Sequence, residues 1–154
     1  MSTVSDILTV ARERLRAGAD SYSGAVTPQE AFALLAADAS IKLIDVRTNA
    51  ERDWVGRVAI AKGQHGAVQW STYPGGNVNG DFLAQLAALS GKQDVLLFLC
   101  RSGVRSRHAA RLASDNGYPH CFDILEGFEG DKDGSGHRKT VNGWCQAGLP
   151  WLGA

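Results

Sequence analysis

The fold of this chain is decided by residues 95–111, VLLFLCRSGVRSRHAAR. The apolar run 95–99 is typical of a short buried strand. It leads to Cys100 and a loop at 101–105, and a helix is predicted to follow from about 106 to 116. In α/β proteins, ligands bind at the carboxyl ends of strands, where helix N-termini and loop N–H groups attract anions. The first anion that these groups would meet here is the thiolate of Cys100.

Short apolar segments alternate with helical segments along the rest of the chain. Further strands are predicted at 41–46, 67–70 and 121–125, and helices at 5–17, 28–37, 49–54 and 81–89. The helix at 28–37 begins with a capping box, Thr27-Pro28-Gln29-Glu30. This alternation predicts an α/β fold with a central parallel sheet of about five strands and helices on both faces. We expect a single domain over residues 1–154, with residues 1–26 as an N-terminal helix and a turn-rich link.

The composition is that of an ordinary globular domain. The apolar fraction is 44%, the charged fraction is 21%, and the formal net charge is zero. No overall field therefore attracts nucleic acid or an anionic membrane, and we expect neither as a partner. The amphipathic N-terminal helix is expected to pack on the domain.

The cysteines indicate one reactive thiol in a reducing compartment. There are three, Cys100, Cys121 and Cys145, and their odd number and long spacing fit neither a disulfide framework nor a zinc site. We expect Cys121 and Cys145 to be buried and inert. Charges such as Arg12 and Arg14 interrupt the N-terminal apolar residues, so no signal peptide is predicted and the expected location is cytoplasmic.

Cys100 has the surroundings of an activated nucleophile. A helix N-terminus and nearby cations stabilise a thiolate, and Gly103 lets the loop curl because glycine tolerates positive φ. Arg101 and Arg105 lie in the loop and would attract an anionic substrate. Arg107 and Arg111 are interpreted as part of a solvated helix face.

Three motifs together resemble the rhodanese family of sulfurtransferases. The loop CRSGVRS at 100–106 is similar to the active-site loop of single-domain rhodaneses. LIDVR at 43–47 is similar to a motif at the end of a strand in the family, and GWCQAGLP at 143–150 is similar to the motif with which the family's domain usually ends. The motifs keep the order that the family shows and extend over roughly residues 27–152.

The resemblance implies a rhodanese-like fold and a relay of sulfane sulfur from a donor such as thiosulfate through a persulfide on the catalytic Cys100. The donor would be a small anion and the acceptor cyanide, a small thiol or a protein thiol, with no metal or organic cofactor. The resemblance places donor binding on the loop residues Arg101, Ser102, Gly103, Val104 and Arg105. Ser106, Asp45 and Arg47 would support the site, although for Asp45 and Arg47 an internal ion pair that braces the loop is favoured.

The chain departs from the family pattern in two places. Where the family often shows Gly-His-Ile, this chain has Gly56-Arg57-Val58, and His65 nearby is expected to be a surface loop residue. Residues 128–142 are predicted to be an inserted loop, and we hypothesise that it overhangs the active site and shapes access of the acceptor. Within it, residues 131–136 resemble the start of a calcium loop of the EF-hand type. The twelfth position counted from Asp131 is Asn142 instead of the Glu that such a loop requires, so a solvated acidic turn is favoured.

Other functions remain open at this point. A persulfide carrier or redox interaction module with a protein partner would use the same thiol but turn over slowly with small acceptors. A cysteine phosphatase or arsenate reductase would need five residues between its cysteine and its arginine, and that position holds Ser106. A catalytically dead scaffold would have no reason to keep Cys100.

Overall fold

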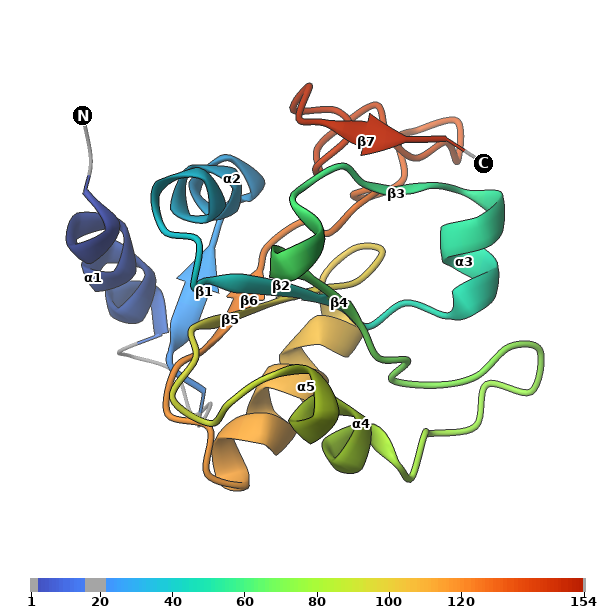
Figure 1. Cartoon of the computed structure of the whole chain (residues 1–154). Helices are drawn as coiled ribbons and strands as arrows, with labels where there is room; N and C mark the ends of the chain where they lie inside the picture. The colour runs from blue at the N-terminus through green and yellow to red at the C-terminus, as the bar shows by residue number, and fades with distance from the viewer. Residues whose placement is uncertain (1–2, 16–21, 154) are drawn as a thin grey trace.

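The computed structural model describes residues 3–15 and 22–153. Its centre is a five-stranded sheet in the order β1-β6-β5-β2-β4, and every pair of neighbouring strands is parallel (Figure 1). The strands are β1 (Gly24–Val26), β2 (Lys42–Asp45), β4 (His65–Ala67), β5 (Leu96–Leu99) and β6 (Cys121–Ile124). The predicted fold, a parallel sheet of about five strands in an α/β arrangement, is confirmed.

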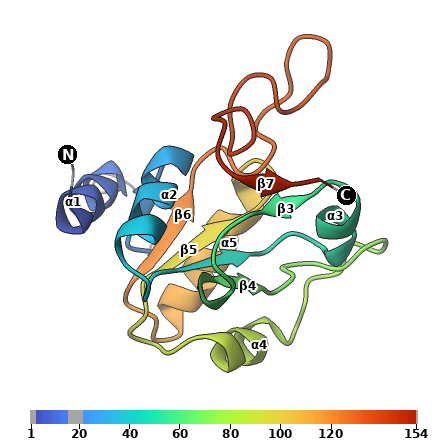
Figure 2. The same ribbon diagram turned by 45° about the horizontal axis from the view of Figure 1, so that its top comes forward.

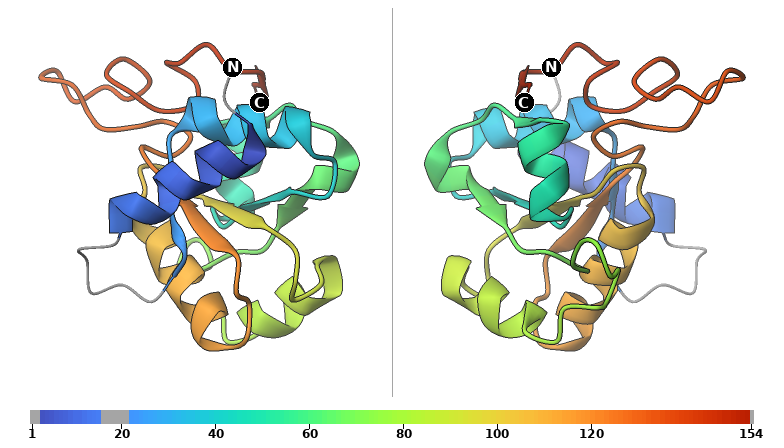
Figure 3. Two further views of the ribbon diagram at one scale, coloured as in Figure 1. Left: turned by 90° about the vertical axis from the view of Figure 1, so that its left-hand side faces the viewer. Right: turned by 90° about the vertical axis from the view of Figure 1, so that its right-hand side faces the viewer.

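Helices cover both faces of this sheet, as the side views in Figure 3 show. Two pack on one face, α1 (Val4–Leu15) and α2 (Pro28–Ala37), and two on the other, α4 (Phe82–Leu89) and α5 (Val104–Asp115). The side chains of β5 alternate accordingly: Leu97 and Leu99 face the first pair, Leu96 and Phe98 the second. Helix α1 packs on the domain as expected; residues 16 and 17 of its predicted span lie outside the described residues.

Two helices begin with reciprocal capping boxes. Thr27 and Glu30 cap α2 as predicted, with each side chain accepting a hydrogen bond from the other's backbone N–H. Thr48 and Glu51 do the same for α3 (Asn49–Trp54). This second box fixes the position of Glu51, which belongs to the site described below.

The segment after β6 returns across the molecule. Its last part, β7 (Trp151–Leu152), pairs antiparallel with β3 (Arg57–Val58), and a short 3₁₀ turn, Lys62–Gln64, precedes β4. Figure 2 shows residues 128–142, in orange to red, as a loop that stands out from the body. Within it the Asp133 carboxylate accepts hydrogen bonds from the Ser135 and His137 backbone and from the Thr140 hydroxyl, which makes a compact acidic turn.

The predicted link at 18–26 is wrong at its end, because Gly24–Val26 is strand β1. A glycine in a turn-rich link indicates a turn, but the role of Gly24 is close packing. A Cβ at this position would lie 2.4 Å from the carbonyl oxygen of Ala11 in α1, so only glycine lets this helix approach the strand.

Two other boundaries also differ from prediction. The strand expected at 67–70 is β4, His65–Ala67, so His65 is a partly buried strand residue and not a surface loop residue. The cysteine loop ends at Gly103, whose φ of 113° lets α5 begin at Val104, two residues before the predicted start. Arg105 and Ser106 therefore lie on the helix. No helix in the described part of the chain is long and apolar enough to cross a membrane.

Candidate active site

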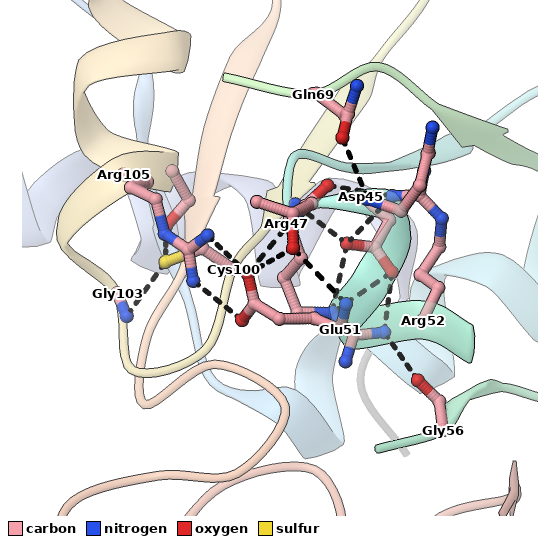
Figure 4. A network of polar contacts seen from close by, with 12 residues as sticks. Asp45, Arg47, Glu51, Arg52, Gly56, Gln69, Cys100, Gly103 and Arg105 are labelled. Atoms are coloured by element: carbon pink, nitrogen blue, oxygen red, sulfur yellow. Dashed lines mark hydrogen bonds and ion pairs between the residues drawn. The ribbon is translucent and has the colours of Figure 1, made fainter. Parts of the chain in front are cut away.

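Cys100 lies between the end of β5 and the start of α5. Its side chain accepts a hydrogen bond from the Gly103 backbone N–H, with 3.0 Å between nitrogen and Sγ (Figure 4). The residue is only 1% exposed. A sulfur that accepts an N–H bond at the N-terminus of a 12-residue helix is in a position that stabilises negative charge on it.

A second polar contact comes from the first turn of α5. The Ser106 hydroxyl oxygen lies 3.3 Å from Cys100 Sγ and donates to the Asp123 carboxylate of β6 at 2.5 Å. Both Ser106 and Asp123 are buried. Three elements, β5, α5 and β6, therefore hold the thiol in one orientation. Of the other predicted loop residues, Ser102 is partly buried and Val104 is exposed.

Arg105 does not stand free to meet an anion. Its guanidinium forms a bidentate pair with Glu51 of α3, at 2.6 and 2.9 Å, and its charge interacts with that of Cys100. Burial alone would raise the pKa of Glu51, but the hydrogen bonds and charge of Arg105, together with Thr48, outweigh it and lower the pKa to about 2. The Glu51 carboxylate is thus ionised and neutralises Arg105.

A cavity of about 330 Å³ adjoins the cysteine loop on the side of α3. It is lined by Thr48, Ala50, Glu51, Trp54, Val55, Tyr73, Arg101 and Arg105. Arg101 is exposed, and it forms no ion pair among the described residues. It is the cation that this cavity offers to a negatively charged ligand.

Asp45 and Arg47 form a fully buried ion pair at the end of β2, 2.8 Å apart. Arg47 also donates to the Gly56 carbonyl, and its guanidinium carbon lies 4.2 Å from the centre of the Phe128 ring. The pair thus ties the end of β2 to the chain after α3 and to the segment after β6. This is the bracing arrangement that the sequence favoured for these two residues.

The segment after β6 supports the backbone of the cysteine loop. Phe128 N donates to the Cys100 carbonyl at 2.8 Å, and the N–H groups of Glu129 and Gly130 converge on the Arg101 carbonyl at 3.0 and 3.1 Å. No described residue of 128–142 lines the cavity beside the loop, and the hypothesis that this segment overhangs the active site and shapes acceptor access stays a prediction. The start of this segment therefore holds the backbone of the cysteine loop in place through hydrogen bonds.

The two other cysteines have thiols whose pKa is raised. All three are free thiols. Burial raises the pKa of Cys121 to about 12, and burial is also the main cause that raises the pKa of Cys145 to about 11. Both are protonated at neutral pH. Cys121 is buried as expected, whereas Cys145 is only partly buried, and that both thiols are inert stays a prediction.

Sequence reasoning missed five residues of this site: Thr48, Glu51, Trp54, Tyr73 and Asp123. The signal for the first two was present, since Thr48 and Glu51 have the spacing of a capping box. Tyr73 lies in the long connection between β4 and α4, and its edge-to-face contact with Trp54 had no local signal in the sequence.

Comparison with known proteins agrees with this geometry. The model of the rhodanese-like domain family matches residues 27–133. An uncharacterised protein of Rickettsia rickettsii is 31% identical over 125 residues, 79% of this chain and 91% of that protein. The crystal structure of Rv0390 from M. tuberculosis has 38% identity and a TM-score of 0.79, and the match covers 86% of this chain and 99% of that one.

More distant structures share the fold alone. A polysulfide-sulfur transferase homodimer from Wolinella succinogenes has a TM-score of 0.59 at 17% identity, with 100% of this chain and 95% of that chain covered. A possible tyrosine phosphatase from Rhodopseudomonas palustris has a TM-score of 0.53 at 20% identity, with 99% and 96% covered. At the level of the family, the matched domain supports sulfurtransferase-type activity. The extent of the family match and the relatives above 30% identity show that this chain belongs to the rhodanese-like domain family.

Proposed function

We propose that this protein is a sulfurtransferase that carries sulfane sulfur as a persulfide on Cys100. The observation that carries the proposal is the hydrogen bond from the Gly103 N–H to Cys100 Sγ at the start of α5. Groups that stabilise a thiolate also stabilise an anionic persulfide at nearly the same place, because both carry their charge on sulfur.

The reaction has two covalent steps. The Cys100 thiolate attacks the outer sulfur of thiosulfate, the sulfur–sulfur bond of the donor breaks, and sulfite leaves with its electron pair. An acceptor thiolate or cyanide then attacks the outer sulfur of the persulfide. The new bond forms as the bond to Sγ breaks, and the electron pair returns to Cys100. Ping-pong kinetics are expected.

The arginines favour this reaction over phosphate transfer. A cysteine phosphatase requires an arginine after five intervening residues, and that position holds Ser106, whose hydroxyl is engaged with Asp123. Arg105, one residue earlier, is held by Glu51. A protein-directed persulfide carrier would share the first step and differ only in its slow turnover with small acceptors.

Intact-protein mass spectrometry after mixing reduced protein with thiosulfate tests the proposal. We expect a gain of one sulfur atom on the wild type and none on Cys100→Ser, while Cys145→Ser, as a matched control, still gains the atom. Protein whose Cys100 alkylates readily but gains no sulfur from thiosulfate or from other sulfane donors would refute the proposal. Thiocyanate formation with cyanide then separates an enzyme from a carrier that loads but does not turn over.

A further inference from the structure

The cavity beside the cysteine loop has two kinds of wall. One is made by exposed aromatic rings, Trp54 at the end of α3 and Tyr73 in the connection after β4. The other is made by charged side chains: Arg101 of the loop, Arg105 of α5 and Glu51 of α3. Figure 4 shows Arg105 beside Cys100 and reaching toward Glu51, so this lining residue of the cavity lies next to the thiol.

The volume of the cavity exceeds what an inorganic sulfur donor needs. A cavity of about 150 Å³ is enough to hold a benzene molecule, and pockets for organic ligands begin at about 300 Å³. The cavity here measures about 330 Å³. Thiosulfate would leave most of it filled with water, whereas a molecule with a ring or a short aliphatic body would occupy it.

The aromatic wall is available for such a body. Trp54 is 70% exposed and Tyr73 is 60% exposed. Their rings already contact each other edge to face, with 5.7 Å between centroids, so they form a preorganised surface. Large rings at this level of exposure gain from being covered by an apolar partner.

The charged wall selects one negative charge. Glu51 and Arg105 neutralise each other through their bidentate pair. Arg101 remains as the unpaired cation of this wall in the part of the chain that is described. The wall as a whole therefore complements a single carboxylate or a similar monoanion.

We propose that this cavity binds the sulfur acceptor, and that the acceptor is an organic thiol with an aromatic or bulky apolar body and one carboxylate. The body packs on Trp54 and Tyr73, and the carboxylate pairs with Arg101. This inference rests on the proposed function, because the acceptor needs a persulfide on Cys100. The outer sulfur of a persulfide stands about 2 Å beyond Sγ, and the proposal requires that it extends from the buried Cys100 side chain toward the cavity.

Four thiols test the two walls separately. Persulfide-loaded protein, freed of donor, is mixed with 2-mercaptoethanol, 3-mercaptopropionate, benzyl mercaptan or 4-(mercaptomethyl)benzoate, and the loss of the added sulfur is followed by mass spectrometry. The variants are Trp54→Ala and Arg101→Gln. Controls are Val10→Ala and Arg57→Gln, which remove an exposed apolar and an exposed basic side chain outside the cavity. Each rate is divided by the same variant's rate with 2-mercaptoethanol. This ratio removes differences between variants in the intrinsic reactivity of the Cys100 persulfide.

We expect Trp54→Ala to lower the relative rates of the two aromatic thiols about 3- to 10-fold. Arg101→Gln should lower those of the two carboxylates about 2- to 5-fold, and only 4-(mercaptomethyl)benzoate should respond to both variants. The controls should keep the wild-type ratios. Ratios that do not change in Trp54→Ala and Arg101→Gln would overturn the assignment of the cavity. Failure to load any sulfur on Cys100 is seen before acceptor is added, and would overturn the proposed function instead.

Discussion

The ion pair between Glu51 and Arg105 can be broken with a single atom exchange, Glu51→Gln. Glutamine keeps the length of the side chain and its oxygen can still accept from the Thr48 N–H, so the capping box of α3 is preserved. The variant therefore removes the negative charge opposite Arg105 and little else. The expected result is a less stable protein whose cavity is more positive.

The magnitude follows from the pKa of Glu51. A fall in pKa from 4.5 to about 2 corresponds to about 3.4 kcal/mol at 1.36 kcal/mol per pH unit. The side chains of Glu51 and Arg105 are 20% and 23% exposed, so water screens the pair and can solvate Arg105 when its partner is lost. We therefore expect Glu51→Gln to cost about 1–2 kcal/mol of the free energy of unfolding at pH 7.

The pH dependence gives the sharper test. Because the folded-state pKa is depressed, the stabilisation is complete above the unfolded value near 4.5 and is lost as pH falls toward 2. Urea unfolding of wild type and variant should therefore differ at pH 7 and pH 5, and the difference should shrink steadily below pH 4.5. A difference that is zero at pH 7, or one that is the same at pH 3 as at pH 7, would refute the reasoning.

Three further results are expected. Gly127→Ala should lower the stability by roughly 1–3 kcal/mol and slow sulfur loading, because φ at this position is +71° and a Cβ would lie 2.5 Å from the carbonyl of Arg101; thermal unfolding and loading by mass spectrometry measure both. Thr27→Ala should cost about 1 kcal/mol in urea unfolding through the lost cap of α2, and Thr27→Ser should restore most of it. Iodoacetamide at pH 8 should leave Cys121 and Cys145 of the folded protein unmodified, as peptide mapping would show, because burial holds their pKa values at about 12 and 11.

The centre of the site could be predicted because its signals are local. An apolar strand, Cys100 and a glycine three residues later are adjacent in sequence, and Gly103 has the positive φ that the turn into α5 requires. Parallel strands also meet at one edge of the sheet, which placed Asp45 and Arg47 near the loop without further information. The start of α5 is predicted two residues too late because no local signal distinguishes Val104, Arg105 and Ser106 as the first residue of the helix. Gly103, which precedes them, makes no side-chain cap.

The parts that could not be predicted depend on contacts between distant segments. Glu51 and Arg105 are 54 residues apart, and nothing near either residue indicates that one will neutralise the other. Strand β1 has three residues and exists because it pairs with β6 nearly a hundred residues later. The exposed rings of Trp54 and Tyr73 meet only once the long connection after β4 is folded.

A comparison of two cysteines explains why we propose Cys100 as the nucleophile. Cys100 and Cys121 are equally buried, at 1% and 0% exposure, and both adjoin strands of the central sheet. The Cys121 thiol donates to the carbonyl of Tyr118, a contact that favours the protonated form. Cys100 Sγ instead accepts from the Gly103 N–H at the start of a helix, a contact that favours the thiolate. Burial is common to both, so the direction of the hydrogen bond, set by which end of the strand the cysteine occupies, is the feature that favours Cys100 over Cys121 as the proposed nucleophile.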